Sequence, residues 1–214
     1  MEKLKVIYVW DAYCGWCYGF DSVLLPFLEA HPELEILTIS GGLFAGDSVT
    51  SLGELGFIKK ANESITEFMG TPFGDAYNTL LDEGTEMLNS AQPAAVYSAF
   101  REHLSGIALV SLIHDLQKKF FIDGKSLSKA KTYLELLEKY GLAAFFSEKD
   151  IQTLLDTEKG AAEDFVLSQQ LDVQGFPSLL ILSDGHLYDL RQGALTISDL
   201  EKNYQELQSH IKNK

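Results

Sequence analysis

The chain of 214 residues has only two cysteines, Cys14 and Cys17, and both lie in one tetrapeptide. Two cysteines are too few for a zinc site, which needs about four ligands, unless histidines complete the set. The five histidines are spread along the chain at no ligand spacing, at His31, His103, His114, His186 and His210. The sequence therefore predicts neither a metal site nor another bound cofactor.

Basic residues are also scarce, since 17 Lys and Arg stand against 31 Asp and Glu, for a formal net charge of -14. Such a charge would repel a nucleic-acid backbone and an anionic membrane surface. No apolar run is long enough to span a bilayer, and the run over 6–10 is shorter than the apolar core of a secretory signal. We therefore expect a soluble, cytoplasmic protein with no nucleic-acid or membrane partner; its oligomeric state is not indicated.

The two cysteines follow an apolar run, residues 5–10, that has the composition of a β-strand. After them, residues recur at helical steps of three and four, at Cys17, Phe20, Leu24 and Leu28. This spacing places Cys14 at the N-terminal tip of a helix and Cys17 on its apolar face. We therefore expect the Cys14 sulfur to face solvent and the Cys17 sulfur to face the core.

Thiol-disulfide exchange requires this asymmetry, because one thiolate attacks a substrate disulfide and a second thiol resolves the mixed disulfide. Cys14 is the predicted nucleophile and Cys17 the predicted resolving thiol. Free N–H groups at a helix N-terminus stabilise a thiolate, whereas Asp11 would oppose it if it lies near, so we expect moderate stabilisation. A purely structural disulfide is the competing interpretation, but closing so short a loop stabilises a fold by only about 2 kcal/mol. Redox chemistry is favoured.

The sequence of the middle part of the chain predicts mainly helices. Residues 33–39 form a second predicted strand, which ends in a glycine-rich turn over 41–46. Between 47 and 156 we find no convincing strand, and one predicted helix has its N-cap at Ser126. Another has an apolar stripe formed by Leu55, Ile58, Ala61, Ile65 and Phe68. This block is predicted to be all helical.

The last part of the chain predicts a helix over 161–170, a β-hairpin of 179–182 and 187–190, and a final helix opened by Ser198. Without the helical block, the order is β-α-β-α-β-β-α, which can form a mixed parallel and antiparallel sheet covered by helices. We therefore predict an α/β domain built from 1–46 and 157–214, interrupted by a helical insertion domain over 47–156.

The chain resembles the DsbA family of thioredoxin-fold proteins, and within it the cytosolic branch of DsbA-like oxidoreductases and disulfide isomerases. The resemblance covers nearly the whole chain. It is carried by Asp11-x-x-Cys14-x-Trp16-Cys17-Tyr18-Gly19, by Gly41-Gly42-Leu43, by the helical insertion and by Gly175-Phe176-Pro177. It implies a thioredoxin fold with a large helical insertion, an active-site disulfide between Cys14 and Cys17, and a cis proline at Pro177 beside it.

A cis bond at Pro177 would turn the backbone of Phe176 towards the cysteines, where it can pair with an extended substrate. Phe176, Pro177 and Trp16 are therefore the predicted substrate-binding residues. Two positions depart from the family pattern. Trp16 stands where strongly oxidising relatives have histidine, and Tyr8, six residues before Cys14, stands where many thioredoxin-fold enzymes have an acid. Whether Asp11 replaces this acid stays open.

Three functions fit these residues. The leading hypothesis is a thiol-disulfide oxidoreductase or isomerase that acts on protein thiols or disulfides, with glutathione as a candidate partner. The alternative enzyme is a glutathione-dependent isomerase or transferase of the kappa-like type, whose members usually carry serine where Cys14 stands. The third hypothesis is an adaptor that holds a protein partner under redox control.

Overall fold

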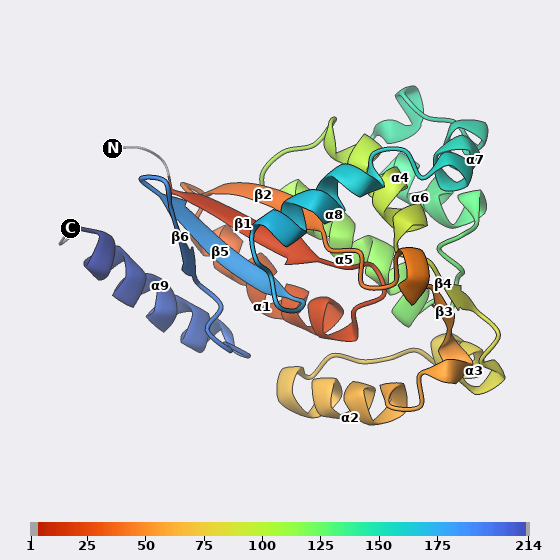
Figure 1. The fold of residues 1–214 in the computed structure, drawn as a ribbon, viewed down its shortest axis with the longest axis horizontal. Coiled ribbons are helices and arrows are strands. Elements are labelled where there is room, and N and C mark those ends of the chain that lie inside the picture. Colours follow the sequence, from red (N-terminus) through yellow and green to blue (C-terminus); the bar gives the residue numbers. More distant parts are fainter. Residues whose placement is uncertain (1–3, 213–214) are drawn as a thin grey trace.

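The computed structural model describes residues 4–212, and its main sheet has four strands in the order β2-β1-β5-β6 (Figure 1). Strand β1 (Lys5–Trp10) is parallel to β2 (Glu35–Ser40), because helix α1 (Gly15–Ala30) returns the chain between them. Strands β5 (Ser178–Ser183) and β6 (His186–Asp189) form the predicted hairpin, and β5 also pairs antiparallel with β1. The predicted mixed sheet is therefore confirmed.

Helices cover both faces of this sheet. Successive side chains of a strand point to opposite faces, so Tyr8 and Trp10 pack on the side of α1 and α9 (Ile197–Lys212). Ile7 and Val9 pack on the other side, against the segment that follows α8 (Ala161–Gln170). Strand β1, which leads directly into the cysteines, is thus buried on both faces. None of the helices described between residues 4 and 212 is long and apolar enough to cross a membrane.

The insertion between β2 and α8 lies beyond the end of the sheet at which β1 stops (Figure 1). Its helices are α2 (Ile58–Met69), α3 (Asp75–Glu83), α4 (Ala91–Arg101), α5 (Ile107–Phe121), α6 (Leu134–Lys139) and α7 (Glu148–Thr157). Single 3₁₀ turns occupy 46–48, 52–54, 130–133 and 142–144. The sequence did not predict the small ladder of β3 (Thr50–Ser51) and β4 (Met87–Leu88), because two residues are too few to show alternation.

Helix α2 packs against the helix that carries the cysteines, because α1 has glycine at Gly15 and Gly19, one turn apart on one face. A Cβ at Gly15 would lie 3.0 Å from the Ile65 side chain, and one at Gly19 would lie 2.8 Å from it. Of the predicted apolar stripe, Ile65 is buried, but Phe68 is 54% exposed. The predicted apolar stripe thus includes an exposed residue, because only a narrow face of α2 contacts α1.

One hydrophobic cluster runs through the α/β part and the insertion. The Trp10 ring meets the Tyr97 ring of α4 edge to face, with centroids 4.9 Å apart. The Tyr18 ring of α1 stacks on Phe121 of α5 at 5.1 Å. The α/β part and the insertion therefore share one core around the end of β1. The division of the chain into domains, whose proposed limits include residues outside 4–212, stays a prediction.

A buried ion pair fastens the insertion to the sheet. The guanidinium of Arg101 in α4 donates to both carboxylate oxygens of Asp164 in α8, each at 2.7 Å. Arg101 also donates to the carbonyl of Thr38 at 2.8 Å, and the Ser40 N–H donates to Asp164 at 2.9 Å. Asp164 is 1% exposed. The pair therefore joins α4, α8 and strand β2 at one point.

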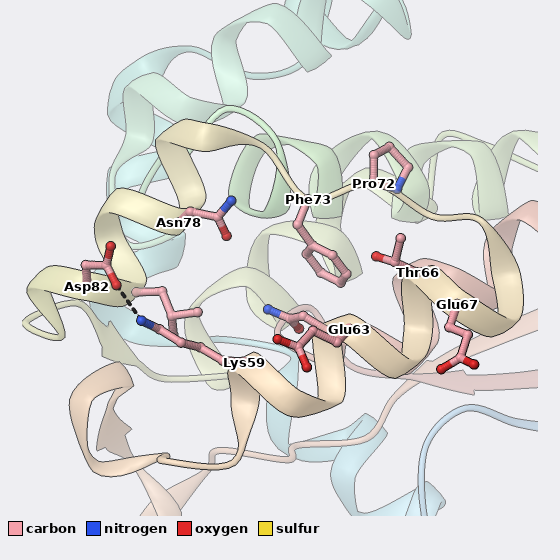
Figure 2. Close-up of a pocket in the computed structure, with 10 residues that line it drawn as sticks. Lys59, Glu63, Thr66, Glu67, Pro72, Phe73, Asn78 and Asp82 are labelled. Carbon is pink, nitrogen blue, oxygen red and sulfur yellow. Dashed lines mark hydrogen bonds and ion pairs between the residues drawn. The ribbon is translucent and has the colours of Figure 1, made fainter.

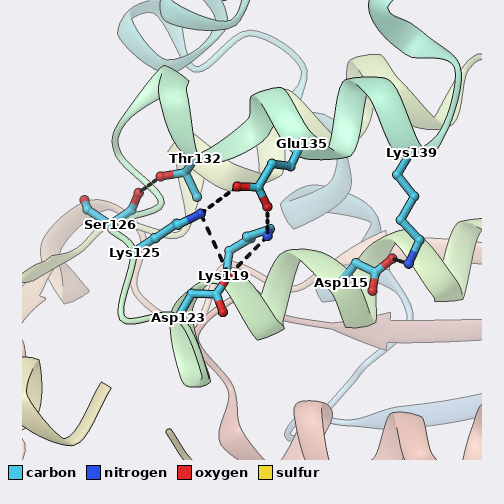
Figure 3. Close-up of polar contacts among 8 residues, drawn as sticks. All are labelled: Asp115, Lys119, Asp123, Lys125, Ser126, Thr132, Glu135 and Lys139. Carbon is cyan, nitrogen blue, oxygen red and sulfur yellow. Dashed lines mark hydrogen bonds and ion pairs between the residues drawn. The ribbon is translucent and has the colours of Figure 1, made fainter. Parts of the chain in front are cut away.

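Charged side chains on the surface hold the end of α5 against the start of α6 (Figure 3). Glu135 accepts from Lys119 and, at 3.0 Å, from Lys125. The Thr132 hydroxyl donates to the carbonyl of Ser126 at 2.6 Å and closes the segment that leads into α6. Surface pairs of this kind contribute little one by one, but these share Glu135 and form a network.

Two predicted helix starts are wrong. The Ser126 hydroxyl accepts from the N–H of Ser128, at 3.3 Å, so it stabilises a turn, and helical structure begins only at residue 130. The last helix is capped two residues earlier than Ser198. The Thr196 hydroxyl accepts from the N–H of Asp199 at 3.1 Å, which is the N-cap interaction.

Candidate active site

Cys14 and Cys17 lie at the N-terminus of α1, just after β1. Cys14 is the N-cap of α1, and its sulfur accepts a hydrogen bond from the Cys17 N–H at 3.3 Å. Cys17 is fully buried on the apolar face, and both cysteines are free thiols. These positions in the helix are as predicted. The expected exposure of Cys14 is wrong, because the loop before β5 folds over its sulfur and leaves Cys14 only 6% exposed.

The loop that covers Cys14 contains the predicted cis peptide bond between Phe176 and Pro177. The Cys14 thiol points at the carbonyl oxygen of Phe176, 3.6 Å from the sulfur. Pro177 is buried and has no N–H, so the crowded site contains no unpaired donor at this position. Phe176, one of the residues predicted to bind substrate at this turn, therefore lies against Cys14, and Pro177 follows it directly. Trp16, in the first turn of α1, is half-buried and packs on the core.

The Gly41-Gly42 turn after β2 makes room for this loop. A Cβ at Gly41 would lie 2.1 Å from the Phe176 ring, so any other residue there would displace the loop. Gly42 has φ +73°, a left-handed conformation that favours glycine, and a Cβ there would lie 2.8 Å from the Phe165 ring. The predicted turn is confirmed: Gly41 makes room for the loop that touches Cys14, and Gly42 makes room for helix α8.

Asp11 is a buried anchor for the segment that leads into the cysteines. Its carboxylate accepts from the N–H groups of Tyr13 and Leu43, at 3.0 and 2.8 Å, and from the Ser90 hydroxyl at 3.1 Å. Burial raises the pKa of Asp11, and these hydrogen bonds oppose the rise. The side chain is 1% exposed. Asp11 thus ties the cysteine loop to the glycine turn and to the insertion.

The sequence analysis missed Gln117, which binds the same loop from the insertion. Its side chain, on α5, is fully buried, and its amide nitrogen donates to the carbonyl of Asp11 at 2.9 Å and approaches that of Cys14 at 3.4 Å. The available signal was a lone amide on an otherwise apolar helix face, next to Leu116 and Phe120. A buried amide is expected to have a hydrogen-bond partner, but the sequence does not show which group that partner is.

A second buried polar network lies next to Cys17. The Tyr8 hydroxyl donates to a carboxylate oxygen of Asp21 at 2.8 Å and lies 3.4 Å from the Cys17 carbonyl oxygen. The other oxygen of Asp21 lies 3.6 Å from Nδ1 of His114 on α5. Burial raises the pKa of Asp21 to about 6, and it raises the pKa of Cys17 well above its ordinary value. Tyr8 therefore contacts an acid one helical turn beyond Cys17, a connection that the sequence did not reveal.

Replacing Asp21 with asparagine is expected to stabilise the protein above about pH 6. The native state keeps the carboxyl proton up to about pH 6, whereas the unfolded chain releases it near its ordinary pKa of 3.8. The free energy of unfolding therefore falls as the pH rises through this window, and Asp21 accounts for a fall on the order of 3 kcal/mol. Asparagine has no proton to lose, and its amide oxygen can still accept from Tyr8.

Urea unfolding of wild type and Asp21→Asn, at about pH 4.5 and about pH 7.5, measures this difference. The difference in free energy of unfolding between Asp21→Asn and wild type should be clearly larger at the higher pH. Asp47→Asn, at an exposed carboxylate, is the matched control and should show no such trend. An Asp21→Asn advantage that is the same at both pH values would contradict a raised native pKa of Asp21.

The chain matches no protein-family model and no curated protein. It is similar to solved structures over almost its whole length. The cytosolic disulfide reductase DsbM from Pseudomonas aeruginosa gives a TM-score of 0.76 at 22% identity, over 98% of this chain and 100% of that chain. The structure of DsbM with GSH gives 0.73 at 21% identity, over 97% and 99%. A candidate protein disulfide isomerase from Nitrosomonas europaea gives 0.71 at 20% identity, over 98% and 100%. A DsbA-like thioredoxin fold with a helical insertion is thereby confirmed.

Proposed function

We propose that this chain is a DsbA-like thiol-disulfide oxidoreductase or isomerase that acts on protein thiols or disulfides. The observation that carries the proposal is the geometry of two free thiols at a helix N-terminus, with Cys14 as N-cap and Cys17 buried behind it. The likeness to a disulfide reductase and to a candidate disulfide isomerase supports the same chemistry.

Cys14 is the proposed nucleophile. Its thiolate attacks one sulfur of a substrate disulfide, the other substrate sulfur leaves as a thiolate, and a mixed disulfide with Cys14 forms. Cys17 then loses its proton and attacks the Cys14 sulfur. A bond between Cys14 and Cys17 forms, the bond to the substrate breaks, and the second substrate sulfur leaves as a thiolate. The substrate has gained two electrons and the enzyme has lost two, so a thiol reductant must return the pair to the dithiol.

The loop at Phe176 and Pro177 is the proposed platform for the substrate backbone. The Phe176 carbonyl lies beside the Cys14 sulfur, so an extended substrate that pairs with this backbone would bring its own sulfur into line. Trp16, half-buried in the first turn of α1, would supply an apolar contact next to the same sulfur.

Glutathione is the proposed source of electrons, and the cytoplasm the proposed location. A structure of DsbM contains GSH, and DsbM is described as cytosolic. Low-molecular-weight thiols of this kind keep cytosolic dithiols reduced.

The direct test is reduction of a protein disulfide by glutathione with and without catalytic amounts of the chain. Turnover well above the uncatalysed rate is expected. A rate equal to that of glutathione alone, with a range of protein disulfides, would refute the proposal.

A further inference from the structure

A pocket of about 800 Å³ lies between α2 and the segment that contains α3 (Figure 2). Two residues of its wall, Asn62 and Phe73, also border the cysteine motif. A Cβ at Gly15 would lie 3.6 Å from the Asn62 side-chain oxygen and 3.9 Å from the Phe73 ring. Gly15 directly follows Cys14, so the pocket borders the cysteine motif through these two side chains.

The polar side of the pocket is formed by α2. Lys59, Glu63 and Glu67 follow one another at steps of four residues, so they form one row along the helix. Lys59 is already paired across the pocket with Asp82 of α3 (Figure 2). Neither Glu63 nor Glu67 has an ion-pair partner within residues 4–212. The pocket therefore offers two uncompensated carboxylates.

The remaining lining combines apolar Pro72, Phe73 and Leu81 with polar Asn62, Thr66 and Asn78. Phe73 points from the opposite wall towards α2, with Pro72 beside it (Figure 2). Lysine and arginine match this combination, because their aliphatic stems pack on apolar surface while the charged head reaches a polar group. A ligand with free carboxylates, such as glutathione, would instead be repelled by Glu63 and Glu67.

We propose that this pocket binds a lysine or arginine side chain of the protein substrate, close in sequence to the substrate's reacting cysteine. The inference rests on the proposed disulfide exchange and adds a substrate class to it. The stem of the basic residue packs on Phe73, and its charge pairs with Glu63 or Glu67. The pocket then places the neighbouring substrate sulfur near Cys14, while the overall negative charge of the chain favours the same partners.

The test uses three quenched fluorescent peptide disulfides that differ at one position near the cysteine, with lysine, norleucine or glutamate. For wild type, kcat/KM should be about three- to tenfold higher for the lysine peptide than for the norleucine peptide, which is the size expected for an ion pair at a partly exposed site. The glutamate peptide should have the lowest kcat/KM. A Glu63→Gln, Glu67→Gln double variant should treat lysine and norleucine peptides alike. High salt should weaken the wild-type preference.

The control is a Glu29→Gln, Glu163→Gln double variant, which changes the net charge equally at exposed residues elsewhere and should keep the preference. A lysine preference that survives in Glu63→Gln, Glu67→Gln would overturn the inference. So would weaker glutathione binding in that variant, since it would identify glutathione as the occupant. If wild type exchanges all three peptides equally, the pocket inference fails alone. If it exchanges none, the proposed function fails.

Discussion

Cys14→Ser is expected to lose all disulfide reduction above the uncatalysed rate, because the hydroxyl that replaces the thiol cannot form a mixed disulfide. Cys17→Ala should behave differently. It keeps the nucleophile and loses the group that resolves the intermediate, so it should accumulate one mixed disulfide with substrate per chain. Non-reducing electrophoresis and mass spectrometry of the trapped species measure both effects.

The matched control for trapping is the Cys14→Ala, Cys17→Ala double variant, which should trap nothing. If Cys14→Ala, and not Cys17→Ala, accumulates mixed disulfides, the two roles are reversed. A Cys14→Ser variant that reduces disulfides as fast as wild type would contradict the proposed role of Cys14 as the nucleophile.

Asp164→Ala is expected to cost about 3 kcal/mol of unfolding free energy, because it removes the only carboxylate that pairs with the partly buried Arg101 guanidinium within residues 4–212. It also removes the acceptor for the Ser40 N–H. A loss of this size corresponds to a fall in melting temperature on the order of 10 °C for a chain of this length. Thermal and urea unfolding measure it.

Glu163→Ala is the control, since Glu163 is the exposed neighbour of Asp164 on the same helix, and it should change stability little. If Asp164→Ala unfolds like wild type, the pair between α4 and α8 does not hold the insertion to the sheet.

Local patterns explain why much of the site could be predicted from the sequence. The strand before the cysteines, the helix after them and the hairpin at Asp184-Gly185 each follow from a short run of residues with a clear period or a turn signal. The cis bond before Pro177 was predicted from family resemblance together with the local turn, and the structure confirms it.

Contacts between distant segments account for what the sequence missed. The low exposure of Cys14 arises from a loop 162 residues further along the chain. Gln117 and Ser90 bind the cysteine loop from the insertion, 106 and 79 residues away from Asp11. Asp21 lies in α1, only four residues from Cys17, but its partners lie elsewhere in the fold. Tyr8 is on strand β1 and His114 is on helix α5. No periodicity within one segment can reveal such pairs.

Redox equilibration of Cys14 and Cys17 with glutathione tests the central claim most directly. The protein is held in mixtures of reduced and oxidised glutathione, remaining thiols are alkylated, and intact mass gives the fraction of each form. We predict a single transition in which both thiols are lost together as an intramolecular disulfide, with a tenfold change in the equilibrium constant for each shift of about 30 mV. Thiols that stay reduced across the whole series, or loss of one thiol alone as a stable glutathione adduct, would contradict a Cys14–Cys17 redox couple.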